Sequence, residues 1–227
     1  VEAAFARAMA LAGEHGVHVL DVPLIQNAGL AALARGDAER LDALIRMARP
    51  GLLPGRWMEA SAQIYLEAGL ALLRGDPRGA RDQADKAYSL VVMGGVPHWV
   101  IHNRLFTAHL EILDGKAAAV RGELDAIIAE TRHIGCDLLL AAALLTLARA
   151  RLDAGERQAA LESLREGLAI GARWNYGHLF LYAAPDVEGR ICALALEEDI
   201  EPCYVRRLVR QRAPRPPADA GECWPWP

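Results

Sequence analysis

Aromatic residues make up only 6% of this 227-residue sequence, although hydrophobic residues of all kinds make up 53%. Alanine and leucine supply most of that hydrophobic content. Both residue types favour helices, whereas strands favour aromatic and β-branched side chains. The sequence therefore has ample material for a core and predicts an all-α fold class.

Cysteine is also scarce: four residues lie far apart, with no Cys-x-x-Cys among them. This usage is typical of reduced thiols in a cytosolic protein. Residues 1–15 lack the basic start and apolar core of a signal peptide. The longest apolar run, residues 138–148, is interrupted by Thr146 and is too short to span a bilayer. We therefore expect a cytoplasmic chain with no membrane partner.

Sequence motifs of common enzymes are missing as well. The chain has no G-x-x-x-x-G-K-[ST], no G-x-S-x-G and no H-E-x-x-H. A net charge of −4 argues against a surface devoted to nucleic acid. We expect no enzymatic activity, no cofactor and no direct nucleic-acid binding by this chain.

Glycine recurs at a fixed period. Four glycines are separated by 39, 40 and 40 residues: Gly36, Gly75, Gly115 and Gly155. Small residues stand seven positions before them, at Gly29, Ala68, Ala108 and Ala148. Five positions after them stand Leu41, Ala80, Val120 and Ala160. These are helical offsets, and glycine can take the left-handed conformation that ends a helix.

Each unit therefore reads as a helix, a glycine turn and a second helix. One such pair cannot bury its apolar face alone, so the pairs have to stack. We expect an α-α superhelix of stacked antiparallel pairs over residues 1–212. The chain begins at Val1 without Met, so we expect it to be a piece of a longer protein. Residues 213–227 are then expected to form a Pro-rich linker toward a further, C-terminal domain. Helices are predicted over residues 2–15, 20–35, 37–49, 57–74, 77–92, 98–113, 116–134, 137–153, 156–171, 177–197 and 202–211.

The pattern of small residue, glycine and alanine resembles the tetratricopeptide repeat (TPR). Ala68, Gly75 and Ala80 match it well, whereas Leu41 departs from the small residue expected. The period exceeds the usual 34 residues. Longer units of this kind resemble the repeat region of large MalT-type (LuxR-family) bacterial transcription activators, over roughly residues 20–200.

The C-terminal run from Ile200 to Arg210, followed by a Pro-rich tail ending in "WPWP", carries a second resemblance. It is similar to the junction in large bacterial regulators between such repeats and a winged-helix domain. This resemblance implies a sensor or scaffold segment that binds an effector or partner, or self-associates, and passes its state to a DNA-binding domain after residue 227. The alternative is a stand-alone adaptor that binds a partner peptide in its concave groove.

Ligand-binding candidates come from the expected concave face, which the first helix of each pair lines. Its exposed positions are predicted to carry Gln26, Tyr65, His102, Asn103, Leu105, His109, Leu145 and Arg149. Such a wall could hold a peptide or a small polar effector, or could simply be solvated. His98 and His102 have the i, i+4 spacing of metal ligands, but no Cys, Asp or Glu joins them within their helix. We assign no metal.

Five arginines crowd residues 206–215. A basic cluster can steer a neighbouring DNA-binding domain toward phosphates. It could equally pair with the acidic run at residues 197–199 or stay solvated, and we favour these two readings.

Overall fold

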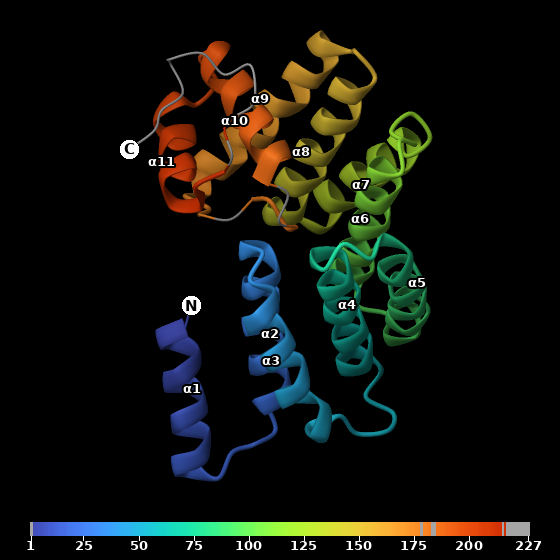
Figure 1. Ribbon diagram of the computed structural model, residues 1–227, viewed down its shortest axis with the longest axis vertical. Helices are drawn as coiled ribbons and strands as arrows, with labels where there is room; N and C mark the ends of the chain where they lie inside the picture. The colour runs from blue at the N-terminus through green and yellow to red at the C-terminus, as the bar shows by residue number, and fades with distance from the viewer. Residues whose placement is uncertain (1, 178, 183–184, 215, 217–227) are drawn as a thin grey trace. The chain divides into compact units, whose positions relative to one another are not determined.

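The computed structural model describes residues 2–177, 179–182, 185–214 and 216. Every regular element within these residues is a helix (Figure 1), which confirms the all-α fold class. The chain forms two compact units, residues 1–103 (unit 1) and residues 104–227 (unit 2), divided within α6 (Pro97–Leu113). A single repeat domain over 1–212 stays a prediction, and nearly all of the expected linker lies outside the described residues.

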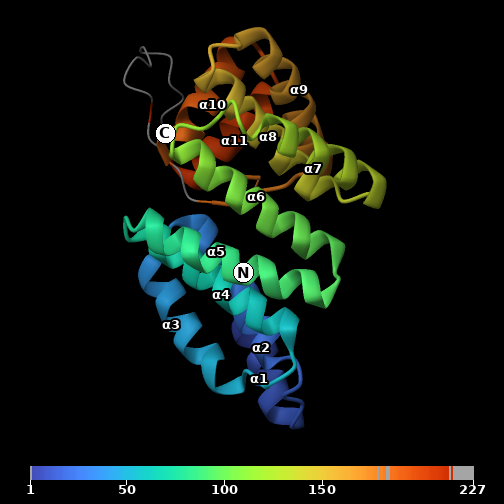
Figure 2. The same ribbon diagram turned by 90° about the vertical axis from the view of Figure 1, so that its right-hand side faces the viewer.

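Neighbouring helices pair within each unit. In unit 1, α2 packs against α3 and α4 against α5, joined by short turns, and in unit 2 α8 packs against both α7 and α9 (Figures 1 and 2). Unit 1 comprises α1 (Glu2–His15), α2 (Asp21–Arg35), α3 (Ala38–Ala48), the short 3-10 helix η1 (Arg49–Gly51), α4 (Trp57–Leu73), α5 (Pro77–Gly94) and the start of α6. Unit 2 continues with α7 (Arg121–Ile134), α8 (Asp137–Asp153), α9 (Arg157–Trp174), α10 (Pro185–Glu197) and α11 (Pro202–Arg212).

The four periodic glycines stand at the bends between paired helices, as predicted. Their φ angles are +71° at Gly36, +78° at Gly75, and +77° at Gly115 and Gly155. Each glycine N–H donates to the carbonyl three residues earlier, over 3.0 Å in every case. The N–H of the following residue donates to the carbonyl five residues before it, at 2.9–3.0 Å. The four bends are therefore copies of one helix-terminating motif.

The small residue before each bend lets the paired helices approach closely. A Cβ added to Gly29 would lie 2.7 Å from the Leu66 side chain and 3.6 Å from that of Leu41. Leu41 is fully buried. The contact with Leu41 would be an ordinary one, so the glycine is required by the close approach of Leu66 from α4.

Three predicted helix boundaries are wrong. Residues 117–120 form turns, so α7 begins at Arg121 rather than at 116. α9 does not end at residue 171 but runs to Trp174, where Asn175 takes the left-handed conformation that ends it. The helix expected over 177–197 begins only at Pro185, which has no N–H to donate and suits a first helical position.

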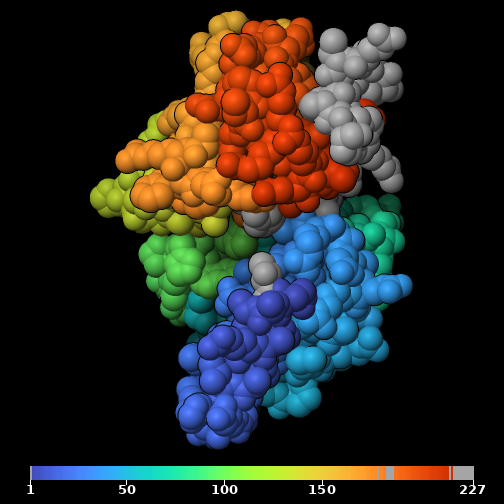
Figure 3. All heavy atoms as spheres, turned by 90° about the vertical axis from the view of Figure 1, so that its left-hand side faces the viewer, coloured from blue at the N-terminus to red at the C-terminus, as the bar shows by residue number. Residues whose placement is uncertain are grey.

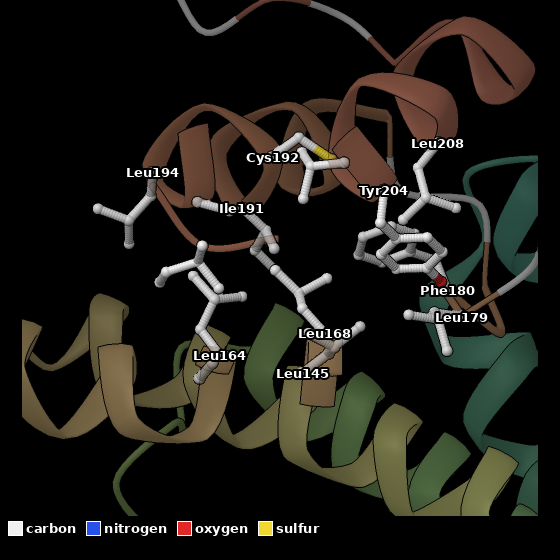
Figure 4. Close-up of a cluster of buried hydrophobic side chains, with 14 of the residues drawn as sticks. Leu145, Leu164, Leu168, Leu179, Phe180, Ile191, Cys192, Leu194, Tyr204 and Leu208 are labelled. Carbon is white, nitrogen blue, oxygen red and sulfur yellow. The ribbon is translucent and has the colours of Figure 1, made fainter. Parts of the chain in front are cut away.

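The core of unit 2 joins α8 and α9 to α10, α11 and the irregular segment 179–180. Side chains from these elements point toward one another, among them Leu145, Leu168 and Ile191 (Figure 4). The C-terminal run that resembles a regulator junction is part of this core: Ile200, Tyr204, Val205, Leu208 and Val209 are all buried. In the space-filling view α10 and α11 form one continuous surface with α9 (Figure 3).

A pair of Gly→Ala substitutions in unit 2 tests the role of the bends. Gly155 has a positive φ, so Gly155→Ala should lower the free energy of unfolding by roughly 1–2 kcal/mol. Gly122 lies in α7, exposed and with nothing near its added Cβ, so Gly122→Ala should raise it by about 0.5–1 kcal/mol. Urea denaturation followed by circular dichroism measures both. A stabilising Gly155→Ala would contradict the assignment.

Candidate functional site

A pocket opens in unit 2 between α8, α10 and the irregular segment 179–182. It is mainly apolar, with a few polar groups from α6, α8 and α10. The centre of a water molecule can occupy about 40 Å³ of it, enough for a few waters or one compact chemical group. The lining residues are His109, Ala142, Leu145, Thr146, Arg149, Leu179, Phe180, Leu181, Tyr182, Val187, Glu188 and Ile191.

His109 and Arg149 form the polar centre of this pocket. The Nη1 atom of Arg149 lies 3.2 Å from Nδ1 of His109. Since a guanidinium can only donate, Nδ1 accepts, and the ring proton of the neutral imidazole is on Nε2. Burial, and then the charge of Arg149, lower the pKa of His109 to about 3. His109 is therefore uncharged near neutral pH.

Arg149 is a largely buried cation whose charge is only partly compensated. Its Nε lies 3.8 Å from Oδ2 of Asp153, and the other oxygen of that carboxylate, Oδ1, accepts from Arg190 at 3.3 Å. That Nε is buried and has no hydrogen-bond partner among the described residues. Burial lowers the pKa of Arg149, Asp153 opposes that shift, and Arg190 adds to it. One carboxylate thus serves two arginines.

Glu188 lines the pocket from α10 but is already paired. Both of its carboxylate oxygens accept from the Arg212 guanidinium, at 2.9 and 2.8 Å, and both side chains are largely buried. The Arg212 guanidinium also lies over the Phe180 ring, 5.9 Å from its centroid. This bidentate pair ties the end of α11 to the pocket.

Tyr182 supplies a flat wall. Its ring centroid lies 4.8 Å from that of His109 and 5.0 Å from that of Phe106. The planes are inclined by 36° and 45°. Together with Phe180, this ring gives the pocket two aromatic surfaces next to the Arg149 guanidinium.

The structure places the predicted groove residues of unit 2 inside, not on an open surface. Leu105, His109 and Leu145 are buried, and Arg149 is nearly so. The prediction that these positions are exposed is therefore wrong for this unit. His109 packs against the Tyr182 ring, and Leu145 packs in one core cluster with Leu179, Phe180 and Ile191. Three of the predicted residues, His109, Leu145 and Arg149, nevertheless line one pocket.

In unit 1 the predicted exposure is also wrong for Gln26, Tyr65 and Asn103, which are buried. The Gln26 Nε2 donates to the carbonyl of Glu59 over 2.7 Å, and the Asn103 Nδ2 to the carbonyl of Trp99 over 2.9 Å. The first bond joins α2 to α4, and the second lies within α6.

His102 keeps partial exposure in unit 1. Its Nε2 is 3.3 Å from the Tyr65 hydroxyl, and its ring lies 5.4 Å from the Trp99 ring, between centroids. His98, one turn earlier, is exposed beside the same tryptophan. No group of three His, Cys, Asp or Glu side chains that could hold a metal occurs within the described residues.

The arginine cluster at 206–215 has several different environments. Arg206 and Arg210 are exposed, Arg207 lies over the Tyr204 ring, and Arg212 pairs with Glu188. Among the described residues, Glu197 and Glu198 of the acidic run accept from Arg157 of α9 and not from this cluster, whose Arg215 lies outside the described residues. None of the helices in the described part of the chain has the length and apolar character of a membrane span.

Nine of the twelve residues that line the pocket were not among the site residues predicted from sequence. Phe180, Tyr182 and Glu188 fell within the helix expected over 177–197, and Arg212 was counted only as part of a basic cluster. A signal was present in "HLFLYAAP", an aromatic-rich apolar run that leads up to a proline. Residues before a proline are biased away from helix, and such a run is suited to irregular, buried structure.

Comparison of the chain with models of known protein families, with curated proteins and with solved structures gave no match. A proposal for its function therefore depends on its own residues.

The histidine buried in the pocket predicts a specific pH dependence. The folded pKa of about 3 is below the unfolded value of His, so the unfolded state binds the proton first as the pH falls. As the pH falls from 7 to 5, the buried neutral His109 should lower the free energy of unfolding by about 2 kcal/mol. His109→Gln, which keeps an acceptor for Arg149, should remove that loss.

Urea denaturation at the two pH values measures the effect. His133→Gln, at an exposed position of α7, is the matched control and should leave the pH dependence unchanged. Equal pH dependence in the wild type and His109→Gln would show that the histidine is not held neutral.

Proposed function

We propose that this chain is a non-catalytic, effector-binding repeat domain of a bacterial transcription regulator and that the pocket in unit 2 is its ligand site. The observation that carries the proposal is the buried Arg149 next to a mainly apolar cavity. A few converging polar groups in an apolar concavity are typical of small-molecule sites.

The state of the polar groups favours binding over catalysis. A general base works best with a pKa near the operating pH, and the pKa of His109 is far below it, with Nδ1 already accepting from Arg149. Both oxygens of Glu188 are held by Arg212. Burial raises the pKa of the Cys192 thiol to about 12, which disfavours the reactive thiolate.

Contacts that link the pocket to the C-terminal helix α11 support a role in a transcription regulator. Glu188 lines the pocket and is joined to Arg212, the last residue of α11. A ligand that displaces Glu188 would alter how α11 ends, and the resemblance at the junction implies a DNA-binding domain beyond it. The mechanism is a population shift between two arrangements of this C-terminal helix.

Methyl NMR of the full 227-residue chain with a library of small fragments tests the proposal. Bound fragments should shift the methyl signals of Leu145, Leu179 and Ile191, which line the pocket, and leave those of Leu44 in unit 1 unchanged. Thr146→Phe places a ring in the pocket and should abolish these shifts.

Ala119→Phe, at an exposed turn position of the same unit, is the matched control and should bind fragments as the wild type does. A library in which no fragment shifts the pocket methyls would contradict the proposal. The regulator part also predicts that, in the intact regulator, Thr146→Phe removes the response of a reporter gene to its effector, whereas Ala119→Phe does not.

A further inference from the structure

Among the described side chains around the pocket, guanidinium groups outnumber carboxylates by one. The described charged side chains that line it, or pair with those that do, are Arg149, Arg190, Arg212, Asp153 and Glu188. Two carboxylates face three guanidinium groups, and His109 is neutral because burial lowers its pKa to about 3. A single negative charge on a ligand would balance this set.

The excess is concentrated on Arg149. Arg212 has a bidentate partner in Glu188, and Arg190 lies closer to Asp153 than Arg149 does. Within the described residues, the Arg149 guanidinium makes only one hydrogen bond, and that is to an uncharged imidazole. A planar guanidinium matches a carboxylate in two parallel hydrogen bonds.

Acceptors for a cationic ligand are already used. The Glu188 oxygens are both engaged by Arg212, and Nδ1 of His109 accepts from Arg149. The rest of the lining is mainly apolar or aromatic and includes Leu145, Ile191, Phe180 and Tyr182. The polar end of a ligand thus meets a cation, and its body meets hydrocarbon.

We propose that the pocket binds a small monocarboxylate with a compact apolar or aromatic body. This inference rests on the proposed function, since it names the chemical class of the effector at the same site. The carboxylate pairs with Arg149, and the body lies between Leu145 and the aromatic rings. A single carboxylate balances the excess charge among the described groups, which a phosphate dianion would exceed.

Titration of the 227-residue chain with benzoate, benzamide and inorganic phosphate tests the proposal. Benzoate should shift the methyl signals of Leu145 and Ile191 with a Kd of about 1 mM, a value typical of a fragment. Benzamide has the same shape without the charge and should bind at least about tenfold more weakly, since charge-assisted hydrogen bonds are the stronger kind. Phosphate alone should cause no saturable shift.

Two variants identify the cation. Arg149→Gln should weaken benzoate binding much more than benzamide binding, so that the two affinities become similar. Arg132→Gln removes an exposed arginine of α7 that pairs with Glu166, and it should bind benzoate as the wild type does. Circular dichroism establishes that both variants are folded, and the benzoate and benzamide comparison on the wild type needs no variant.

The outcomes separate this inference from the proposed function. Equal affinity for benzoate and benzamide, or benzoate binding that survives Arg149→Gln, would overturn the carboxylate assignment while the pocket remained a ligand site. The carboxylate assignment would also be overturned if neutral fragments bound the pocket and neither benzoate nor short aliphatic monocarboxylates did. If no fragment of any charge shifted the pocket signals, both proposals would fail.

Discussion

The fold depends on a backbone constraint: a residue that tolerates a positive φ must stand at intervals of 19 or 20 residues. Glycine meets it at eight positions and Asn175 at the ninth: Gly16, Gly36, Gly55, Gly75, Gly95, Gly115, Gly135 and Gly155. Most other side chains would clash in that conformation, whereas Asn is the side chain that tolerates it best. Regular bends place residues about 40 positions apart side by side in successive pairs. The period in the sequence identified every second bend, and the bends between them follow the same spacing.

This spacing explains both the surface ion pairs of unit 2 and its pocket. Arg121 contacts Glu156, Arg132 contacts Glu166 and Arg157 contacts Glu198, across separations of 35, 34 and 41 residues. The Arg149–His109 contact spans 40 residues and belongs to the same series. In this one case the partner is a neutral imidazole instead of a carboxylate, and the contact is buried. The guanidinium charge that glutamates balance elsewhere is therefore left for a ligand.

The helix pairs were predicted correctly and the exposure of the groove side chains was not, for different physical reasons. Turn chemistry is local, so glycine and the small residues opposite it predicted the helix pairs and their register. Exposure is not local: the same inward face of a helix can line an open groove or lie beneath a further layer. A clue was present in α8, where the run at 138–148 is apolar on every side, a pattern typical of a helix buried all round. We used this apolar run only to exclude a membrane span and did not infer from it that α8 is covered on all sides. Leu145 and His109 were therefore expected to be exposed in a groove.

The pocket lies where the repeat is interrupted. After Asn175 a regular array would begin another helix at once, but Leu179 to Tyr182 form no helix and α10 begins only at Pro185. In an irregular segment, neighbouring side chains can all be buried on one side. Leu179, Phe180 and Tyr182 are buried although they are nearly consecutive. They cover the end of α8 incompletely, and the remaining gap is bordered by a cation. A local departure from a consistent pattern costs stability, and natural proteins keep such departures at functional sites. The interruption and the only partly compensated Arg149 are independent features, and they coincide at one place in unit 2.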